Sequence, residues 1–337
     1  MSERINLAIV GANSLVGKAI LELLEQRDFP LAKLHCLEKE DGSEASLTFK
    51  NRSIEIKSWQ DFDFSSVDIA IFAEVDSSEV ELTVTAGKAG CVVITNQPVF
   101  RHAQDIPLVV AGINNEAIAD YTRHNIIATP DATTVHVIRV LDAIYRNVGL
   151  NSITLNCSQA VSSAGDAGVS ELASQTARLL NVQPIEPKAF SNQIAFNLIP
   201  QVGELLDSGY TRDETEITAG IQKIFSDHAL EIEPAITQVP VFFGDTLDMI
   251  FWPQQAITLS EVRKLISEQD GVELRNDEII SPVTEVAESE LLSVSRIRQV
   301  LAEKQAFRLT LIADNVRTGR ALNMLKVAEI LQMAYLD

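Results

Sequence analysis

The chain has 337 residues, of which 46% are hydrophobic and 22% are charged, a composition that suits a globular protein of about two domains. Its formal net charge of −20 would repel a phosphate backbone over most of the surface, which argues against a nucleic-acid partner. No apolar run approaches the roughly 18 residues of a membrane span, and the N-terminal sequence MSERINLAIV lacks the plan of a signal peptide. We therefore expect a cytoplasmic protein without a membrane partner.

The first predicted strand, Ile5 to Val10, leads into a glycine-containing turn and then an amphipathic helix, 19–25. Strand, glycine turn and helix in this order form the pyrophosphate cradle of a dinucleotide fold. The alternative is a tight strand–helix turn that binds no ligand. The candidate cofactor-binding residues are Gly11, Asn13, Ser14, Leu15, Val16 and Gly17.

The second predicted strand, Lys33 to Leu37, ends in the acidic run 38–43. A dinucleotide fold places its ribose-reading residue about 20 positions beyond the glycines; the residue is acidic for a free 2′-hydroxyl and arginine for a 2′-phosphate. The run therefore favours NAD over NADP if either cofactor binds. The alternative is a solvated acidic loop.

The three cysteines, Cys36, Cys91 and Cys157, stand singly in apolar segments. No paired spacing suggests a disulfide framework or a zinc site. We expect buried, reduced thiols and no bound metal.

Near the middle of the chain, the strand-like run Ile126 to Ala128 precedes a segment in which apolar residues recur at three- and four-residue spacing as far as Val148. Gly149 can close this helix. The turn 129–134 is therefore a helix N-terminus, where backbone N–H groups and the macrodipole stabilise a thiolate or a developing oxyanion. A nucleophile would be expected there, and this chain has Ala132.

The sequence Thr129-Pro130-Asp131-Ala132-Thr133-Thr134 resembles the Asn-Pro-Asn-Cys-Thr-Thr turn of the aspartate-semialdehyde dehydrogenase family, in which the cysteine attacks the substrate carbonyl. Further similar segments, among them 159–165, 195–203 and 313–323, extend the resemblance from Gly11 to Leu331. It implies an α/β fold: an N-terminal dinucleotide-binding (Rossmann-like) domain at 1–130 and an α+β dimerisation domain with a broad mixed sheet at 131–314. A C-terminal helix, 315–337, would return to the first domain, and the protein would be a homodimer.

The resemblance also identifies catalytic positions that this chain has changed. Gln238 stands at the arginine that clamps the substrate carboxylate, and Asp245 stands at the histidine that acts as acid and base. Glu216 replaces a lysine that binds phosphate. Gln159, which in the family orients the acyl intermediate, is retained. Because the other catalytic positions are changed, no catalytic set is intact.

Other family positions keep a possible binding role. Arg101 matches an arginine that holds phosphate, although a lone arginine beside residues such as His102 and Asp105 is more often part of a surface ion pair. Two acids, Asp213 and Glu214, stand where the family binds the substrate amine. The resemblance also places Asn315 at the border of the cofactor.

Five changes affect the cofactor site that the resemblance implies. Ser14 replaces the middle glycine of the turn, where its hydroxyl can either hydrogen-bond or crowd the pyrophosphate. Asp41 occupies the place of the arginine that reads NADP. Glu74 and Asp76 replace small residues near the nicotinamide. Arg320 also replaces a small residue, and its side chain can either obstruct the cofactor or pair with the carboxylates of Glu74 and Asp76.

We therefore favour an inactive paralogue, a pseudoenzyme that acts by binding, as a homodimer or as a regulatory mixed dimer with an active relative. One alternative is an enzyme with altered chemistry in the same cleft, using Gln159, Asp245 and Asp131. A third hypothesis is a retained NAD(P)-dependent semialdehyde dehydrogenase of amino-acid biosynthesis. It requires a nucleophile other than Ala132, and Cys157 would shift the reacting atom by about 7 Å.

Overall fold

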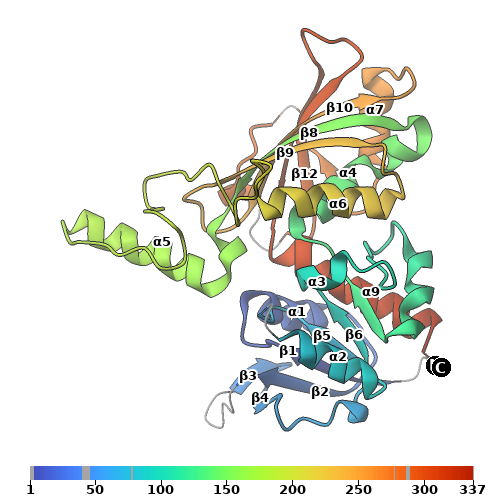
Figure 1. Cartoon of the computed structure of the whole chain (residues 1–337), viewed down its shortest axis with the longest axis vertical. Helices are drawn as coiled ribbons and strands as arrows, with labels where there is room; N and C mark the ends of the chain where they lie inside the picture. Colours follow the sequence, from blue (N-terminus) through green and yellow to red (C-terminus); the bar gives the residue numbers. More distant parts are fainter. Residues whose placement is uncertain (1–3, 40–45, 77–78, 277, 286–288, 337) are drawn as a thin grey trace. The chain divides into compact units, whose positions relative to one another are not determined.

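The computed structural model describes residues 4–336 except 40–45, 77–78, 277 and 286–288 (Figure 1). The chain divides into two compact units. Unit 1 comprises Met1–Asp131 and Arg320–Asp337, and unit 2 comprises Ala132–Gly319. Asp41, the predicted cofactor-reading position, lies outside the described residues.

Unit 1 is built on a seven-stranded sheet in the order β3-β4-β2-β1-β5-β6-β7. Neighbouring strands are parallel, except that β3 and β4 form an antiparallel pair. The central strands β5 and β6 are buried at every residue, as a parallel sheet covered on both faces requires. The strands are β1 (Ile5–Val10), β2 (Leu31–Glu38), β3 (Ser46–Phe49), β4 (Arg52–Ser58), β5 (Ile69–Phe72), β6 (Val92–Thr95) and β7 (Ile126–Ala128).

The helices of unit 1 include one from the far end of the sequence. This helix, α9, packs on α1, where Glu329 pairs with Arg27 at 2.7 Å. Asn323 of α9 accepts a hydrogen bond from the Ala111 amide at 3.0 Å and donates one to the Val109 carbonyl at 3.1 Å. The helical segments are α1 (Leu15–Gln26), η1 (Phe64–Ser66), α2 (Val80–Lys88), α3 (Pro98–Arg101), η2 (Asn115–Arg123) and α9 (Leu322–Ala334).

Unit 2 is built on a six-stranded mixed sheet in the order β11-β12-β13-β10-β8-β9. The pairs β8–β9 and β11–β12 are parallel, and the remaining pairs are antiparallel. Burial alternates along β10, so one face of the sheet is covered more fully than the other. The strands are β8 (Leu150–Gln159), β9 (Glu231–Gln238), β10 (Asp245–Pro253), β11 (Val272–Leu274), β12 (Leu292–Gln299) and β13 (Phe307–Ala313).

The long helix α4 (Ala132–Val148) packs on β8 and β10 and contacts both α6 (Arg212–Phe225) and α7 (Leu259–Ser267). The helix predicted from the spacing of apolar residues is confirmed. Gly149 follows its last residue, and the φ of 68° at this position suits glycine. Three short segments complete unit 2: η3 (Val161–Ala164), α8 (Pro282–Glu285) and the π-helical turn η4 (Arg317–Ala321), which runs into unit 1. The predicted α/β fold, with a dinucleotide-type domain and a second domain on a mixed sheet, is confirmed.

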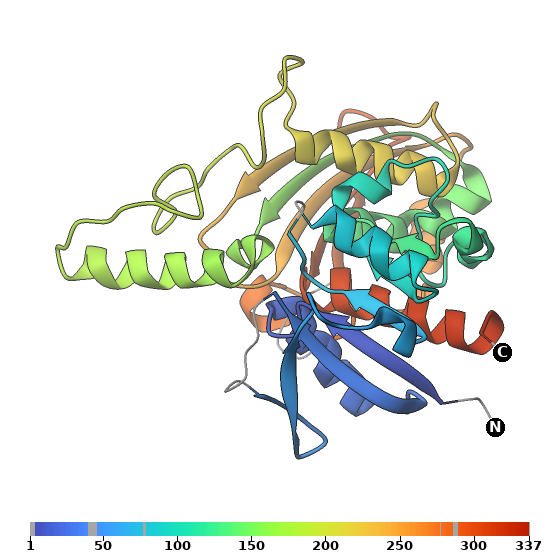
Figure 2. The same cartoon turned by 60° about the horizontal axis from the view of Figure 1, so that its bottom comes forward.

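An arm projects from the sheet of unit 2 and consists of α5 (Gly165–Leu180) and the segment 181–205 (Figures 1 and 2). Gln175 fastens the segment to the helix, because its side-chain oxygen accepts hydrogen bonds from the amides of Ile194 and Ala195 at 2.9 and 3.1 Å. The arm has a small core of Val161, Leu172, Ile194, Ala195 and Ile199. Its large exposed apolar side chains are Leu180, Val182, Phe196, Leu198 and Leu205.

Replacing Gln175 by alanine is expected to lower the free energy of unfolding by about 2–4 kcal/mol, because two buried backbone N–H groups lose their acceptor. Urea unfolding measures the loss, and hydrogen exchange at Ile194 and Ala195 locates it. Ser174→Ala, at an exposed position of the same helix, is the control and should change little. Equal stability of the two variants would contradict the role given to Gln175.

Candidate active site at the start of α4

Ala132 begins α4, and its side chain is covered by the backbone of η4. A Cβ atom added to Gly319 would lie 2.4 Å from the Ala132 Cβ and 2.9 Å from Nε2 of His136. The residue at 319 must therefore be glycine for this packing, and Ala132 is only 5% exposed. A methyl group lies where the sequence predicted a nucleophile.

Cys157 of β8 lies next to the first turn of α4. Its sulfur is 3.7 Å from the Thr133 hydroxyl, and the residue is 2% exposed. None of the three cysteines forms a disulfide, and all three are buried, as predicted. Burial raises the pKa of both the Cys36 and the Cys91 thiol to about 12.

Gln159 and Gln238 are paired neighbours at the ends of β8 and β9. The Gln238 side-chain amide donates a hydrogen bond to the Gln159 carbonyl at 2.8 Å, and its oxygen accepts one from the Ser163 hydroxyl at 3.5 Å. Gln238 is 3% exposed. The side chain at the carboxylate-clamp position thus joins two strand ends to η3 and carries no charge for a substrate.

Asp245, at the start of β10, is 1% exposed, and its Oδ1 accepts a hydrogen bond from the Ala160 amide at 2.9 Å. Its carboxylate therefore holds the backbone directly after Gln159. The alternative acid–base pair of Asp131 and Asp245 joins residues of different units and stays a prediction.

Asn315 brings two further segments to this region. Its Oδ1 accepts hydrogen bonds from the Ser162 hydroxyl at 3.0 Å and from the Gly244 amide at 3.4 Å. Within unit 2, the structure thus gathers the ends of β8 and β9, the start of β10 and the segment after β13. Asn315 is buried, and its predicted contact with a cofactor stays a prediction.

The two acids predicted to bind the substrate amine have structural contacts in α6. Glu214 forms a capping box with Thr211, accepting a hydrogen bond from its amide at 2.8 Å, and also accepts one from the Ile236 amide at 3.2 Å. Asp213 packs on Gly203, where an added Cβ would lie 2.6 Å from its carboxylate. The Thr-x-x-Glu spacing is a known capping signal, and it would have identified the role of Glu214 in advance.

Arg101 lies at the end of α3 in unit 1 and donates a hydrogen bond to the Asn96 carbonyl within its own segment. The alternative of a surface ion pair stays a prediction, and the neighbouring Asp105 contacts His124 at 2.6 Å. That hydrogen bond lowers the pKa of Asp105. A phosphate contact of Arg101 remains a prediction.

The glycine turn of unit 1 has the geometry of a dinucleotide cradle. Gly11 has a φ of 77°, and an added Cβ would lie 2.9 Å from the Glu74 carbonyl. At Gly17 an added Cβ would lie 2.3 Å from the Gly11 carbonyl, so only glycine allows the helix to approach the strand. These are the roles that the first and last glycines have in such turns, and the turn therefore fits a pyrophosphate.

Ser14, which replaces the middle glycine, caps α1. Its hydroxyl accepts a hydrogen bond from the Gly17 amide at 3.0 Å and donates one to the Gly11 carbonyl at 2.6 Å. The hydroxyl therefore stabilises the turn itself. Val16 is fully buried in the core of unit 1, and its predicted contact with a cofactor stays a prediction.

The predicted pairing of Arg320 with Glu74 or Asp76 is confirmed for Glu74. Its guanidinium lies 3.6 Å from the carboxylate of Glu74, and both residues belong to unit 1. Glu74 follows β5, on the opposite side of β1 from β2. This is the half of the crevice where the second nucleotide of a dinucleotide lies.

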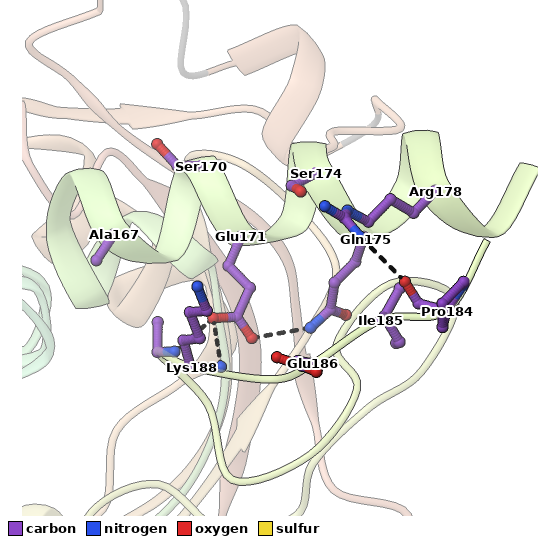
Figure 3. A pocket seen from close by; sticks show the side chains of 11 residues that line it. Ala167, Ser170, Glu171, Ser174, Gln175, Arg178, Pro184, Ile185, Glu186 and Lys188 are labelled. Carbon is purple, nitrogen blue, oxygen red and sulfur yellow. Dashed lines mark hydrogen bonds between the residues drawn. The ribbon is translucent and has the colours of Figure 1, made fainter. Parts of the chain in front are cut away.

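A cavity of about 590 Å³ lies in the arm, outside the predicted site (Figure 3). Figure 3 shows the Gln175 amide donating to Glu171 and Arg178 donating to the Pro184 carbonyl, at 2.8 and 3.2 Å. These bonds fasten the cavity wall to α5. In the described part of the chain, no cluster of three His, Cys, Asp or Glu could hold a metal ion, and no helix could cross a membrane.

Comparison with known proteins identifies both halves of the chain. Residues 6–121 match the family described as semialdehyde dehydrogenase, NAD binding domain, and residues 141–318 match semialdehyde dehydrogenase, dimerisation domain. The chain is 38% identical to aspartate-semialdehyde dehydrogenase 2 of Vibrio cholerae, covering 99% of this chain and 100% of the relative. It is 33% identical to a Pseudomonas aeruginosa protein called USG-1 protein homolog, with both chains fully covered.

Among solved structures, aspartate semialdehyde dehydrogenase II from Vibrio cholerae, complexed with ASA, superposes with a TM-score of 0.96 at 37% identity. That match covers 99% of this chain and 100% of the other. The dimerisation domain supports a homodimer, and the NAD-binding domain supports NAD or NADP as cofactor. The chain belongs to the aspartate-semialdehyde dehydrogenase family.

Proposed function

We propose that this chain keeps the fold and dimer of its family but does not catalyse the phosphorylating dehydrogenase reaction, and that it acts by binding. The observation that carries the proposal is Ala132, a methyl group buried beneath Gly319 at the helix start. Loss of the nucleophile from a coupled catalytic set costs on the order of 10⁶ in turnover.

The neighbouring positions support the same conclusion. Gln238 offers a substrate carboxylate no charge and is engaged with Gln159 and Ser163. Asp245 accepts a hydrogen bond from the Ala160 amide, and a carboxylate cannot exchange protons near neutral pH as an imidazole does unless its pKa is strongly raised.

The proposed partner is a second chain of the same fold. It is either another copy of this chain or, in a regulatory mixed dimer, an active relative. We further propose NAD rather than NADP as the favoured cofactor, because acidic residues follow β2 where NADP-binding members carry arginine.

A retained dehydrogenase is the second candidate. Relatives that match over their full length at 35–38% identity carry that name. Cys157 would have to be the nucleophile, and its sulfur does lie 3.7 Å from the Thr133 hydroxyl in the first turn of α4. Against it stand the 2% exposure of Cys157 and its place on a strand rather than at the helix start.

The test is an assay with aspartate semialdehyde, phosphate and each nicotinamide cofactor, applied to the wild type, Cys157→Ser and the buried-cysteine control Cys91→Ser. We expect no turnover in any of the three. Turnover that is lost in Cys157→Ser and kept in Cys91→Ser would establish the second candidate and overturn the first. Turnover that survives Cys157→Ser and is lost in Asp245→Asn would indicate altered chemistry.

A further inference from the structure

Glu38, the last residue of β2, is held against the glycine turn of unit 1. Its Oε1 accepts a hydrogen bond from the Asn13 amide at 2.6 Å. The turn is fixed to the same strand end by two backbone bonds, from the Gly11 and Ala12 amides to the Leu37 carbonyl at 2.9 and 3.3 Å. The carboxylate and the turn therefore form one preorganised structure.

The position of β2 gives this carboxylate a specific environment. In the sheet, β2 and β5 lie on opposite sides of β1, so the strand order reverses at β1. Dinucleotides bind across such a reversal, and an acid about 20 residues beyond the glycines contacts the adenosine ribose. Glu38 follows Gly17 by 21 residues and stands at the carboxyl end of β2.

The Glu38 carboxylate itself favours a hydroxyl, which can donate a hydrogen bond to it, over a phosphate, which carries the same sign of charge. Among the described residues, the Glu38 carboxylate accepts a single hydrogen bond, from the Asn13 amide, so its second oxygen can accept another. Lys39, the adjacent cation, is paired with Glu79 at 2.5 Å and thus with a further carboxylate. No arginine immediately follows β2, the place where NADP-binding folds carry one.

We infer that Glu38 is the specificity-determining residue of unit 1: its carboxylate accepts a hydrogen bond from the 2′-hydroxyl of an adenosine ribose and repels a 2′-phosphate. The ligand class is an adenine nucleotide with a free 2′-hydroxyl, as in NAD. This inference rests on the proposed function, in which the nucleotide-binding turn is retained. It transfers to Glu38 the role that the sequence suggested for Asp41.

Calorimetric titration of the full chain tests the inference with NAD, NADP, AMP and adenosine 2′,5′-bisphosphate. The last two probes lack the nicotinamide, so they bind independently of the Glu74–Arg320 pair. We expect each probe with a free 2′-hydroxyl to bind at least tenfold more tightly than its 2′-phosphate counterpart. In Glu38→Gln, which keeps an oxygen for the Asn13 amide, that preference should fall about tenfold or more.

Glu116→Gln, the same change of charge at an exposed site of η2 in unit 1, is the matched control and should keep the wild-type preference. Melting temperatures of both variants establish that they fold. An unchanged preference in Glu38→Gln, tighter binding of the 2′-phosphate probes by the wild type, or no binding of any probe would each overturn the inference. The turnover assay does not depend on the preference for a free 2′-hydroxyl. The proposed loss of catalysis and the proposed role of Glu38 can therefore be refuted independently.

Discussion

Replacing Ala132 by cysteine is expected to create a thiol that ionises at a lower pH than the native cysteines and than a cysteine placed near the other end of α4. A thiol at a helix N-terminus has a pKa lowered to about 3.5–7.5, because the macrodipole and the free N–H groups stabilise the thiolate. Cys36 and Cys91, with a pKa of about 12, are thiolate in only about 10⁻⁵ of molecules at pH 7. The ultraviolet absorbance of the thiolate, followed over pH, gives the midpoint for the new thiol.

Ala143→Cys is the matched control, since it makes the same change near the other end of α4, where the dipole disfavours a thiolate. Its midpoint should lie near or above 8.5. A midpoint for Ala132→Cys that equals or exceeds the control would contradict the helix-start argument. We expect Ala132→Cys alone to remain without turnover, because Gln238 and Asp245 still lack the charge and the imidazole of the family. Recovery of turnover in this single variant would show that neither Gln238 nor Asp245 prevents catalysis.

The second large effect is a loss of stability on acidification caused by His136. This residue is fully buried, and burial, reinforced by the charge of Arg139, lowers its pKa from 6.5 to about 3. The unfolded chain takes up a proton near pH 6.5, whereas the folded protein takes it up only near pH 3. The stabilising contribution is therefore full above pH 6.5 and is lost as the pH falls, by about 2 kcal/mol at pH 5.

Urea unfolding of the wild type and His136→Gln at pH 7, 6 and 5 measures this effect as the change in their stability difference. Exposed His228 supplies the control, and His228→Gln should follow the wild type. Burial raises the pKa of Asp314, which shifts stability in the opposite direction, but this contribution cancels in the difference. A difference that stays constant from pH 7 to pH 5 would show that His136 is not held neutral.

Those parts of the fold that depend on local pattern could be predicted from the sequence. The spacing of apolar residues after Val135 defined α4, because helical periodicity is a property of neighbouring residues. The short apolar runs likewise defined β1 and β7. The pairing of Arg320 with Glu74 was also accessible, since it needed only opposite charges at two positions that the resemblance placed together.

The site itself was less predictable, because its contacts join distant segments. Nothing near Ala132 in the sequence shows that Gly319 covers it. The contact of Glu38 with the Asn13 amide was also hidden, since the acidic run offered several carboxylates and the sequence does not show which of them reaches the turn. For Glu214, in contrast, the sequence contained a local capping signal. That signal and the resemblance predicted different roles for this residue, a helix cap and a contact with the substrate amine.

The return of α9 to unit 1 has a consequence for synthesis on the ribosome. Unit 1 begins with the first strand of the protein but lacks α9 and the Asn323 bonds until all of unit 2 has been translated. Unit 2 is continuous in sequence and has its own sheet, so we expect it to fold while the first 131 residues are still incomplete. During that interval the apolar surface that α9 covers is open to water, and a ribosome-associated chaperone is expected to bind there.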